Sequence, residues 1–244
     1  MSEESFVSHL IELRTRLIRS IAAILIVFIC IFPWARELYA LLARPLLAAL
    51  PKGGQMIATD VVGVFLVPMK VAIMCAFLIT LPNTLYQIWA FVAPGLYNHE
   101  RKLIVPLIFA SVILFITGMA FAYFLVFPTV FHFMSSIAPA GVAWMTDIDK
   151  YLSFTLGMFV AFGFTFQVPV IVIVLVHTGL VTPVQLAAWR PYIIVGAFVA
   201  GAILTPPDVI SQLMLAIPMW LLFESGLLCA KMIRPMKKRG MLPP

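Results

Sequence analysis

The chain has 244 residues, of which 63% are hydrophobic and only 11% are charged, and its mean hydropathy is +1.09. A typical globular protein is about 45–50% apolar and about 25% charged, so this composition excludes a soluble enzyme, a nucleic-acid-binding domain and a disordered chain. The net charge of +6 is typical of a membrane protein whose lysines and arginines gather on the cytoplasmic side. We therefore expect an integral membrane protein without a nucleic-acid partner.

Uncharged apolar runs predict six membrane-spanning helices, because about 20 mostly apolar residues are needed to cross the hydrocarbon core. The expected fold class is all-α, a polytopic membrane protein with a single integral membrane domain over residues 1–244. A cleavable signal peptide is the alternative for the first span, but no small-residue cleavage pattern follows it. The predicted spans are Leu17–Trp34, Val71–Phe91, Leu103–Phe127, Leu152–Val176, Pro191–Leu204 and Val209–Ala230.

The distribution of basic residues predicts the orientation. Six spans place both chain ends on one side of the membrane, and 11 of the 16 lysines and arginines fall on that side. The positive-inside rule makes that side cytoplasmic. Five or seven spans would place the basic C-terminal tail outside, so six spans with both termini in the cytoplasm fit the charges better.

The first outer loop and three prolines predict departures from a straight bundle. Leucines at helical spacing beside Arg36 and Arg44 indicate a short helix lying at the membrane surface, which Pro45 and Pro51 would bend or end. Prolines inside the second, fourth and sixth spans predict kinked helices, which membranes tolerate when neighbours satisfy the freed carbonyls. An open, curved bundle should result. These prolines are Pro82, Pro169 and Pro218.

The fifth and sixth helices are predicted to be short. Only 15 residues, Pro191–Thr205, separate Arg190 from the following Pro-Pro turn. They reach about 22 Å at about 1.5 Å per residue, less than the hydrocarbon core of about 30 Å. The sixth has only 15 uncharged residues, Val209–Phe223, before Glu224. A short pair of this kind should thin the bilayer locally, and the alternative is that neighbouring helices shield the pair from the lipid.

No catalytic motif is visible, so we expect no enzymatic activity. The chain lacks the signatures of serine hydrolases, zinc proteases and phosphate-binding loops, and it lacks an intramembrane aspartate pair. Its histidines and cysteines are scattered, with no spacing typical of metal ligands or disulfides. We therefore predict no catalytic residue, no metal and no cofactor. These scattered residues are His9, His99, His132, His177, Cys30, Cys75 and Cys229.

A few polar residues inside the spans are candidates for function. Glu224 is an acid well inside an apolar span, where a charge is costly and functional by default, although it could also reach interfacial water or pair with Lys231. Gln167 lies mid-span, where its amide could bond to a neighbouring helix or serve translocation. Thr205 and Gln212 flank the turn between the last two spans, and they either stabilise that turn or form a polar docking face.

Two acids lie on the otherwise basic cytoplasmic side, Glu12 before the first span and Glu100 in the first cytoplasmic loop. A carboxylate binds a guanidinium group through a two-bond fork, so both acids could receive a cationic ligand. Local pairing of Glu12 with Arg16, and of Glu100 with Arg101 or Lys102, is the alternative. The residues alone favour local pairing.

Several polar stretches resemble the TatC family, the six-span subunits of twin-arginine translocases. The resemblance extends over nearly the whole chain, and the motifs keep the order and spacing of the family. Chance similarity among apolar helices would not reproduce the polar loop residues. The stretches are Ser8–Arg14, Phe91–Tyr97 with His99–Arg101, Gly118–Phe124, Tyr151–Phe154, Gly196–Phe198 and Leu204–Asp208.

The resemblance implies a receptor in the bacterial cytoplasmic membrane that acts, with TatB, on folded precursors carrying a signal peptide with paired arginines. It implies recruitment of TatA, transport driven by the protonmotive force, and contacts with lipid and with other copies of TatC. Signal-peptide binding would involve Glu12, Glu100, Phe91, Pro94 and Arg101. Docking of the single-span partners would involve Thr205 and Gln212.

One position departs from the family, and another class remains possible. Many members have a glutamate where this chain has Gln167, so a required charge there is doubtful, although an amide can still supply a polar, membrane-facing group. A small-solute secondary transporter is the alternative function, but it would need internal repeats and paired intramembrane charges, which are not clearly present. An intramembrane protease would need a nucleophile and a base at one depth, and no such motif is visible.

Overall fold

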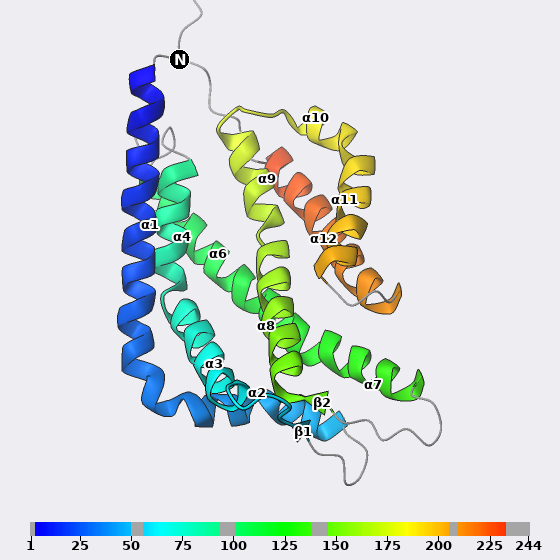
Figure 1. The fold of residues 1–244 in the computed structure, drawn as a ribbon. Helices are drawn as coiled ribbons and strands as arrows, with labels where there is room; N and C mark the ends of the chain where they lie inside the picture. Colours follow the sequence, from blue (N-terminus) through cyan, green and yellow to red (C-terminus); the bar gives the residue numbers. More distant parts are fainter. Residues whose placement is uncertain (1–2, 50–55, 93–100, 138–145, 205–208, 233–244) are drawn as a thin grey trace, which may run out of the picture. The chain divides into compact units, whose positions relative to one another are not determined.

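The computed structural model describes residues 3–49, 56–92, 101–137, 146–204 and 209–232. Nearly all of these residues are helical (Figure 1). Within them, the regular strand structure is one short parallel pair, β1 (Met56–Ile57) and β2 (Thr146–Asp147). The predicted all-α, polytopic fold class is confirmed.

The described helices account for all six predicted spans. Four stretches are long and apolar enough to cross a membrane, and a bent helix pair, α3 (Gly63–Ile79) with α4 (Leu81–Val92), qualifies as a further one. The remaining predicted span corresponds to α11 (Arg190–Leu204), a shorter apolar helix. The four long stretches are Val7–Arg44, Val105–Phe133, Ile148–His177 and Val209–Met232.

Backbone contacts divide the chain into two compact units. The first comprises Met1–Val92 with Ala120–Val160, and the second comprises Ala93–Met119 with Ala161–Pro244. The third and fourth predicted spans therefore each contribute residues to both units. The single domain and the open, curved bundle expected from the sequence concern the whole chain, and they stay predictions.

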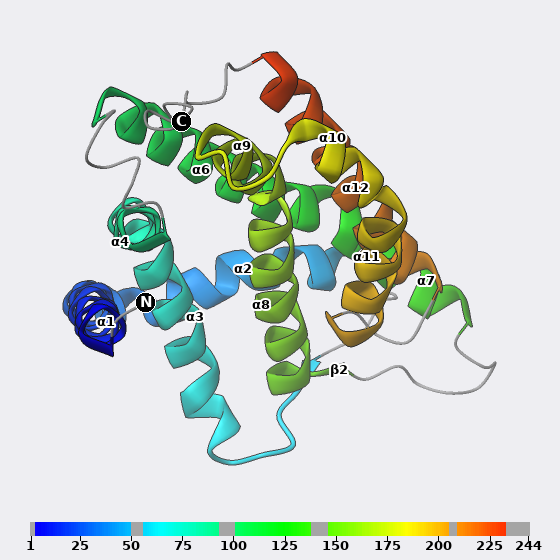
Figure 2. The ribbon, with the colours of Figure 1, turned by 90° about the horizontal axis from the view of Figure 1, so that it is seen from above.

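In the first unit, the N-terminal helix α1 (Glu3–Ile31) turns at a short 3-10 helix into α2 (Ala35–Ala49). The turn is plain in Figure 1, so the helix predicted for the first outer loop exists as a separate element. This helix continues past Pro45 to Ala49. Helix α1 also packs along α3 (Gly63–Ile79) and α4 (Leu81–Val92), which Figure 2 shows beside it.

The second predicted span is broken at Thr80, where the axes of α3 and α4 differ by 60°. The buried Thr80 hydroxyl donates a hydrogen bond to the carbonyl of Ala76 at 2.8 Å, which also accepts the Thr80 backbone N–H. Pro82 lies in the first turn of α4, where a missing N–H costs no helical bond. The predicted kink in this span is confirmed.

The third predicted span is longer than the sequence indicated. Helix α6 (Arg101–Phe121) passes through the π-helical turn Ala122–Val126 into α7 (Phe127–Ile137). The predicted end at Phe127 is wrong because Pro128 falls in the first turn of α7, where proline is compatible with a helix.

Proline has different effects in the fourth and sixth spans. Helix α8 (Ile148–Thr165) gives way to α9 (Val168–His177) at Phe166 and Gln167, immediately before Pro169, so the predicted interruption is confirmed. Helix α12 (Val209–Met232), in contrast, runs through Pro218 as one helix of 24 residues. The prediction of a short sixth helix is therefore wrong.

In the first unit, polar side chains link α3 to the start of α8 and stabilise the β1–β2 pair. Lys70 on α3 donates a hydrogen bond to Asp149 on α8 at 2.5 Å. The carboxylate of Asp147 accepts hydrogen bonds from the Thr59 hydroxyl and, at 3.1 Å, from the Lys150 backbone N–H. These bonds to its charged form lower the pKa of Asp147 to about 2. The short β1–β2 pair is thus reinforced by side chains.

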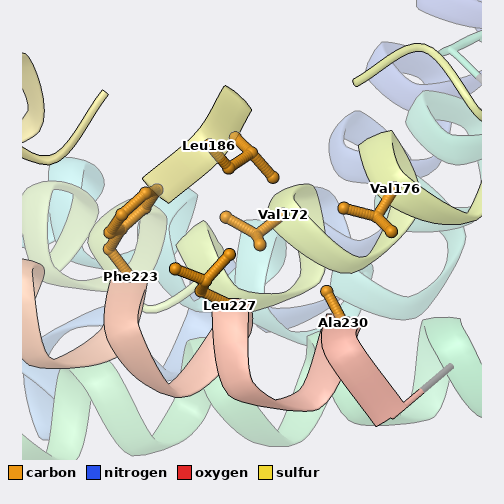
Figure 3. Packing of buried hydrophobic residues seen from close by; sticks show 6 residues of the cluster. All are labelled: Val172, Val176, Leu186, Phe223, Leu227 and Ala230. Carbon is orange, nitrogen blue, oxygen red and sulfur yellow. The ribbon is translucent and has the colours of Figure 1, made fainter. Parts of the chain in front are cut away.

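The second unit has a compact apolar core between α9, α12 and the short helix α10 (Pro183–Ala188). Figure 3 shows side chains from the three helices pointing toward one another. Helices α9 and α12 approach closely because α12 has no side chain at Gly226. A methyl group there would lie 2.7 Å from the Cα atom of Pro169. The core residues are Val172, Val176, Leu186, Phe223, Leu227 and Ala230.

Replacing Gly226 with alanine is expected to destabilise the second unit, because the new methyl group meets backbone atoms of α9 that cannot easily move. Overpacking of this kind costs about 1–3 kcal/mol. The measurement is the denaturant midpoint of the purified protein in detergent. Gly196→Ala is the matched control, since nothing lies within 4 Å of a methyl group at that position. Equal midpoints for both variants would contradict the close packing of α9 and α12.

Candidate functional site

Glu12 on α1 is bound by an arginine of the same helix. Arg16 donates hydrogen bonds to Glu12 Oε1 from Nε at 2.9 Å and from Nη2 at 2.6 Å. Its Nη1 atom donates to Oε1 of Gln87, a buried residue of α4, at 3.3 Å. The local pairing that the sequence offered as an alternative is therefore present, but the Glu12 side chain remains 41% exposed.

An aromatic pair lies beside this acid. The rings of His9 on α1 and Phe91 on α4 are stacked, with centroids 4.3 Å apart and an interplanar angle of 18°. His9 Nδ1 also lies 4.0 Å from Glu12 Oε2. The structure thus brings together Glu12 and Phe91, two of the residues expected to bind a signal peptide. Glu100, Pro94 and the side chain of Arg101 lie outside the described residues.

Sequence reasoning assigned no role to His9 or Gln87, although both contact this acid or its partner arginine. The spacing of His9 three residues before Glu12 would place both on one helix face, so this neighbour could have been found. No comparable signal identified Gln87, because its contact with Arg16 depends on how α4 packs against α1.

Gln212 links the last two helices. Its side-chain amide donates a hydrogen bond to the backbone carbonyl of Phe198 on α11 at 2.8 Å. Gly201 leaves room for it, since a methyl group there would lie 3.0 Å from Gln212 Cγ. Gln212 therefore stabilises the α11–α12 hairpin, and its role in docking stays a prediction. Thr205 lies outside the described residues.

Glu224 pairs with Arg190 rather than with Lys231, which corrects one expectation from the sequence. Arg190 Nε donates to Glu224 Oε1 at 2.5 Å and Nη2 donates to Oε2 at 2.8 Å, a two-bond fork between the start of α11 and α12. A planar guanidinium matches both carboxylate oxygens, which an ammonium group cannot do. Helix α12 continues past Glu224 to Met232.

Gln167 is buried, with 4% of its surface exposed, so the expectation of a membrane-facing amide is wrong. It lies at the break between α8 and α9, and its Nε2 atom donates to the Ser111 carbonyl of α6 at 2.8 Å. Its Oε1 atom has no hydrogen-bond partner among the described residues. The amide therefore serves helix packing within the second unit.

These features define a helical, multi-pass membrane protein. Within the described ranges, no three His, Cys, Asp or Glu side chains gather in a way that could hold a metal ion. The family model described as Sec-independent protein translocase protein (TatC) matches residues 8–218. The chain therefore belongs to the TatC family, and it is a multi-pass component of a bacterial translocase.

Individual relatives agree with this assignment. The chain is 52% identical over 228 residues to the Sec-independent protein translocase protein TatC of Azotobacter chroococcum mcd 1, covering 93% of this chain and 89% of the relative. It is 50% identical over 223 residues to the protein of that name from Escherichia coli strain K12, covering 91% and 86%. The crystal structure of a twin arginine translocase receptor, TatC, superposes with a TM-score of 0.80 at 38% identity, covering 92% of this chain and 98% of that one.

Reversing the charge of Glu224 is expected to loosen the α11–α12 hairpin, because Glu224→Arg places a second cation against Arg190. The measurement is the thermal midpoint of the purified protein, together with disulfide crosslinking of cysteines introduced across the two helices. The exchanged pair Arg190→Glu, Glu224→Arg should recover most of the lost stability. Lys231→Glu serves as the control and should have a smaller effect. No recovery in the exchanged pair would show that the fork does not stabilise the hairpin.

Proposed function

We propose that the chain is the receptor subunit of a twin-arginine translocase. It binds signal peptides with paired arginines and, with TatA and TatB, passes folded proteins across the membrane using the protonmotive force. The observation that carries the proposal is the exposed carboxylate of Glu12, which already accepts two hydrogen bonds from an arginine side chain. The solved relative named as a twin arginine translocase receptor supports the same function.

The surroundings of Glu12 suit a ligand with a guanidinium group. The stacked rings of His9 and Phe91 offer an apolar, polarisable surface next to the acid, and guanidinium planes stack favourably on such rings. In this proposal, Glu100 supplies the acid for the second arginine, and Pro94 and Arg101 complete the surface. A pair of acids would then recognise a pair of arginines.

The remaining features of the proposal concern assembly. We place both termini in the cytoplasm and the chain, as a single domain, in the bacterial cytoplasmic membrane, because 11 of the 16 basic residues fall on the side of the termini. Other TatC copies and membrane lipids are its further partners. The hairpin of α11 and α12 receives the single-span subunits TatA and TatB.

Removing the acids is expected to abolish recognition of the signal peptide. A hydrogen bond to a charged group contributes about 1.5–3 kcal/mol, so Glu12→Lys or Glu100→Lys should weaken photo-crosslinking of a twin-arginine peptide by at least about tenfold. The double variant should lose crosslinking altogether. Glu37→Lys, which makes the same charge change at an exposed acid of α2, is the control and should crosslink normally. Normal crosslinking by a stably inserted double variant would refute the proposed function.

Partner docking is tested at Gln212. Hydrogen bonds between helices in a bilayer are worth about 0.6 kcal/mol on average and about 1.7 kcal/mol at most, so Gln212→Leu should reduce crosslinking of α11 and α12 to TatA or TatB by about three- to twentyfold. Signal-peptide binding should be unchanged. Ile217→Leu, a conservative change at an exposed position of α12, is the control.

Gln212→Leu also removes the hydrogen bond from Gln212 to Phe198 within the hairpin, so the stability of the variant must be measured as well. The thermal midpoint of the Gln212→Leu protein separates a loss of docking from a loosened hairpin. Reduced partner crosslinks at an unchanged midpoint support docking at this residue. Unchanged partner crosslinks place the docking site elsewhere on the chain.

A further inference from the structure

We propose that Arg16 is an internal competitor for the arginine-binding carboxylate, so that an arriving peptide arginine must displace it from Glu12. This inference rests on the proposed function of Glu12 as an acid that receives a signal arginine. It adds a specificity-determining residue within the chain. Arg16 presents to Glu12 the same chemical group that the ligand would bring.

The arrangement of the bonds explains why displacement is needed. Both hydrogen bonds from Arg16, from Nε and from Nη2, end on the same oxygen, Oε1 of Glu12. The other oxygen, Oε2, lies 4.0 Å from His9 Nδ1, which is beyond hydrogen-bond distance. A two-bond fork with an incoming guanidinium uses both oxygens of the carboxylate. This fork is blocked while Arg16 occupies Oε1.

Arg16 has a second acceptor to which it remains bound when it leaves Glu12. Its Nη1 atom, which takes no part in the Glu12 contact, donates to Oε1 of Gln87 at 3.3 Å. Gln87 is buried in α4. A partly buried cation that loses every partner is costly, and Gln87 limits that cost during the exchange. The side chain of Arg16 is only 20% exposed, whereas Glu12 is 41% exposed, so the acid is the more accessible member of the pair.

Competition of this kind raises the Kd of every cationic ligand by the same factor. A lysine cannot form the two-bond fork, so a twin-lysine peptide starts from a weaker affinity than a twin-arginine peptide. When both Kd values rise by this factor at a fixed peptide concentration, the Kd of the weaker ligand exceeds that concentration first. The weaker ligand then occupies few of the sites, while the stronger ligand still occupies many. Arg16 therefore converts a modest difference in affinity into a difference in occupancy.

The test measures the Kd of fluorescent synthetic peptides for the full chain in lipid nanodiscs. Each peptide carries an arginine pair or a lysine pair ahead of an apolar segment. Arg16→Gln should lower the Kd of the twin-arginine peptide by about tenfold, since a charged hydrogen bond is worth at least that factor. The Kd of the twin-lysine peptide should fall by a similar factor. Arg16→Lys, which keeps the charge but cannot place two N–H groups of a planar guanidinium on Oε1, should give an intermediate decrease.

Arg14→Gln is the matched control for net charge. Arg14 lies on the same helix and is exposed, so its loss should change the Kd by less than about twofold, as expected for a screened surface charge. An Arg16→Gln protein that binds the twin-arginine peptide no more tightly than the parent overturns the inference. Equal tightening by Arg14→Gln also overturns it. If Arg16→Gln fails to fold, the Arg16→Lys variant is the test. An unchanged Kd of the twin-arginine peptide for Arg16→Lys then overturns the inference.

The Glu12→Gln variant distinguishes failure of the proposed function, in which Glu12 binds the peptide, from failure of the proposed competition by Arg16. If Glu12→Gln binds the twin-arginine peptide as tightly as the parent, the acid is not a receptor residue, and the proposed function of the site fails. If Glu12→Gln weakens binding while Arg16→Gln does not strengthen it, only the competition fails. Tightening by Arg16→Gln that disappears in the double variant with Glu12→Gln supports the inference.

Discussion

The interior of a bilayer offers no hydrogen-bond partners, so each polar group of a spanning segment must find one within the protein. This constraint explains how the described helices are interrupted and joined. Thr80 bonds back to the Ala76 carbonyl where α3 ends, and Gln167 bonds to the Ser111 carbonyl beside the break between α8 and α9. Gln212 does the same across the hairpin of α11 and α12. Gln167 and Gln212 therefore join helices, whereas Thr80 bonds within its own segment.

Charged groups near the ends of the predicted spans are paired as well. Arg16 with Glu12 and Arg190 with Glu224 are guanidinium–carboxylate contacts with two hydrogen bonds each. They differ in geometry, because Arg190 engages both carboxylate oxygens and Arg16 engages one. The first is a complete fork that joins two helices. In the second, both bonds end on Oε1 of Glu12, which is the geometry on which the proposed exchange depends.

The sequence predicted the helices well because apolar runs and prolines act locally. The break at Pro169 and the bounds of α11 agree with the expectation to within a few residues. Contacts between distant segments could not be predicted in this way. The pairing of Glu224 with Arg190 joins residues 34 positions apart, and the burial of Gln167 depends on its contact with α6. For the candidate site, the residues alone singled out Glu12 and the family resemblance added Phe91, whereas Gln87 emerged only from the packing of α1 against α4.

The last two helices differ in length, so they do not match the thickness of the bilayer equally well. Helix α11 has 15 residues and reaches about 22 Å, whereas α12 has 24 residues and reaches about 36 Å. A hydrocarbon core of about 30 Å is longer than the first and shorter than the second. The predicted thinning would therefore depend on α11 alone, and α12 would fit the same bilayer by tilting or by extending its charged end into the interface. The fork between Arg190 and Glu224 ties the start of α11 to α12 eight residues before α12 ends at Met232. It therefore fixes the start of α11 at a defined point along α12.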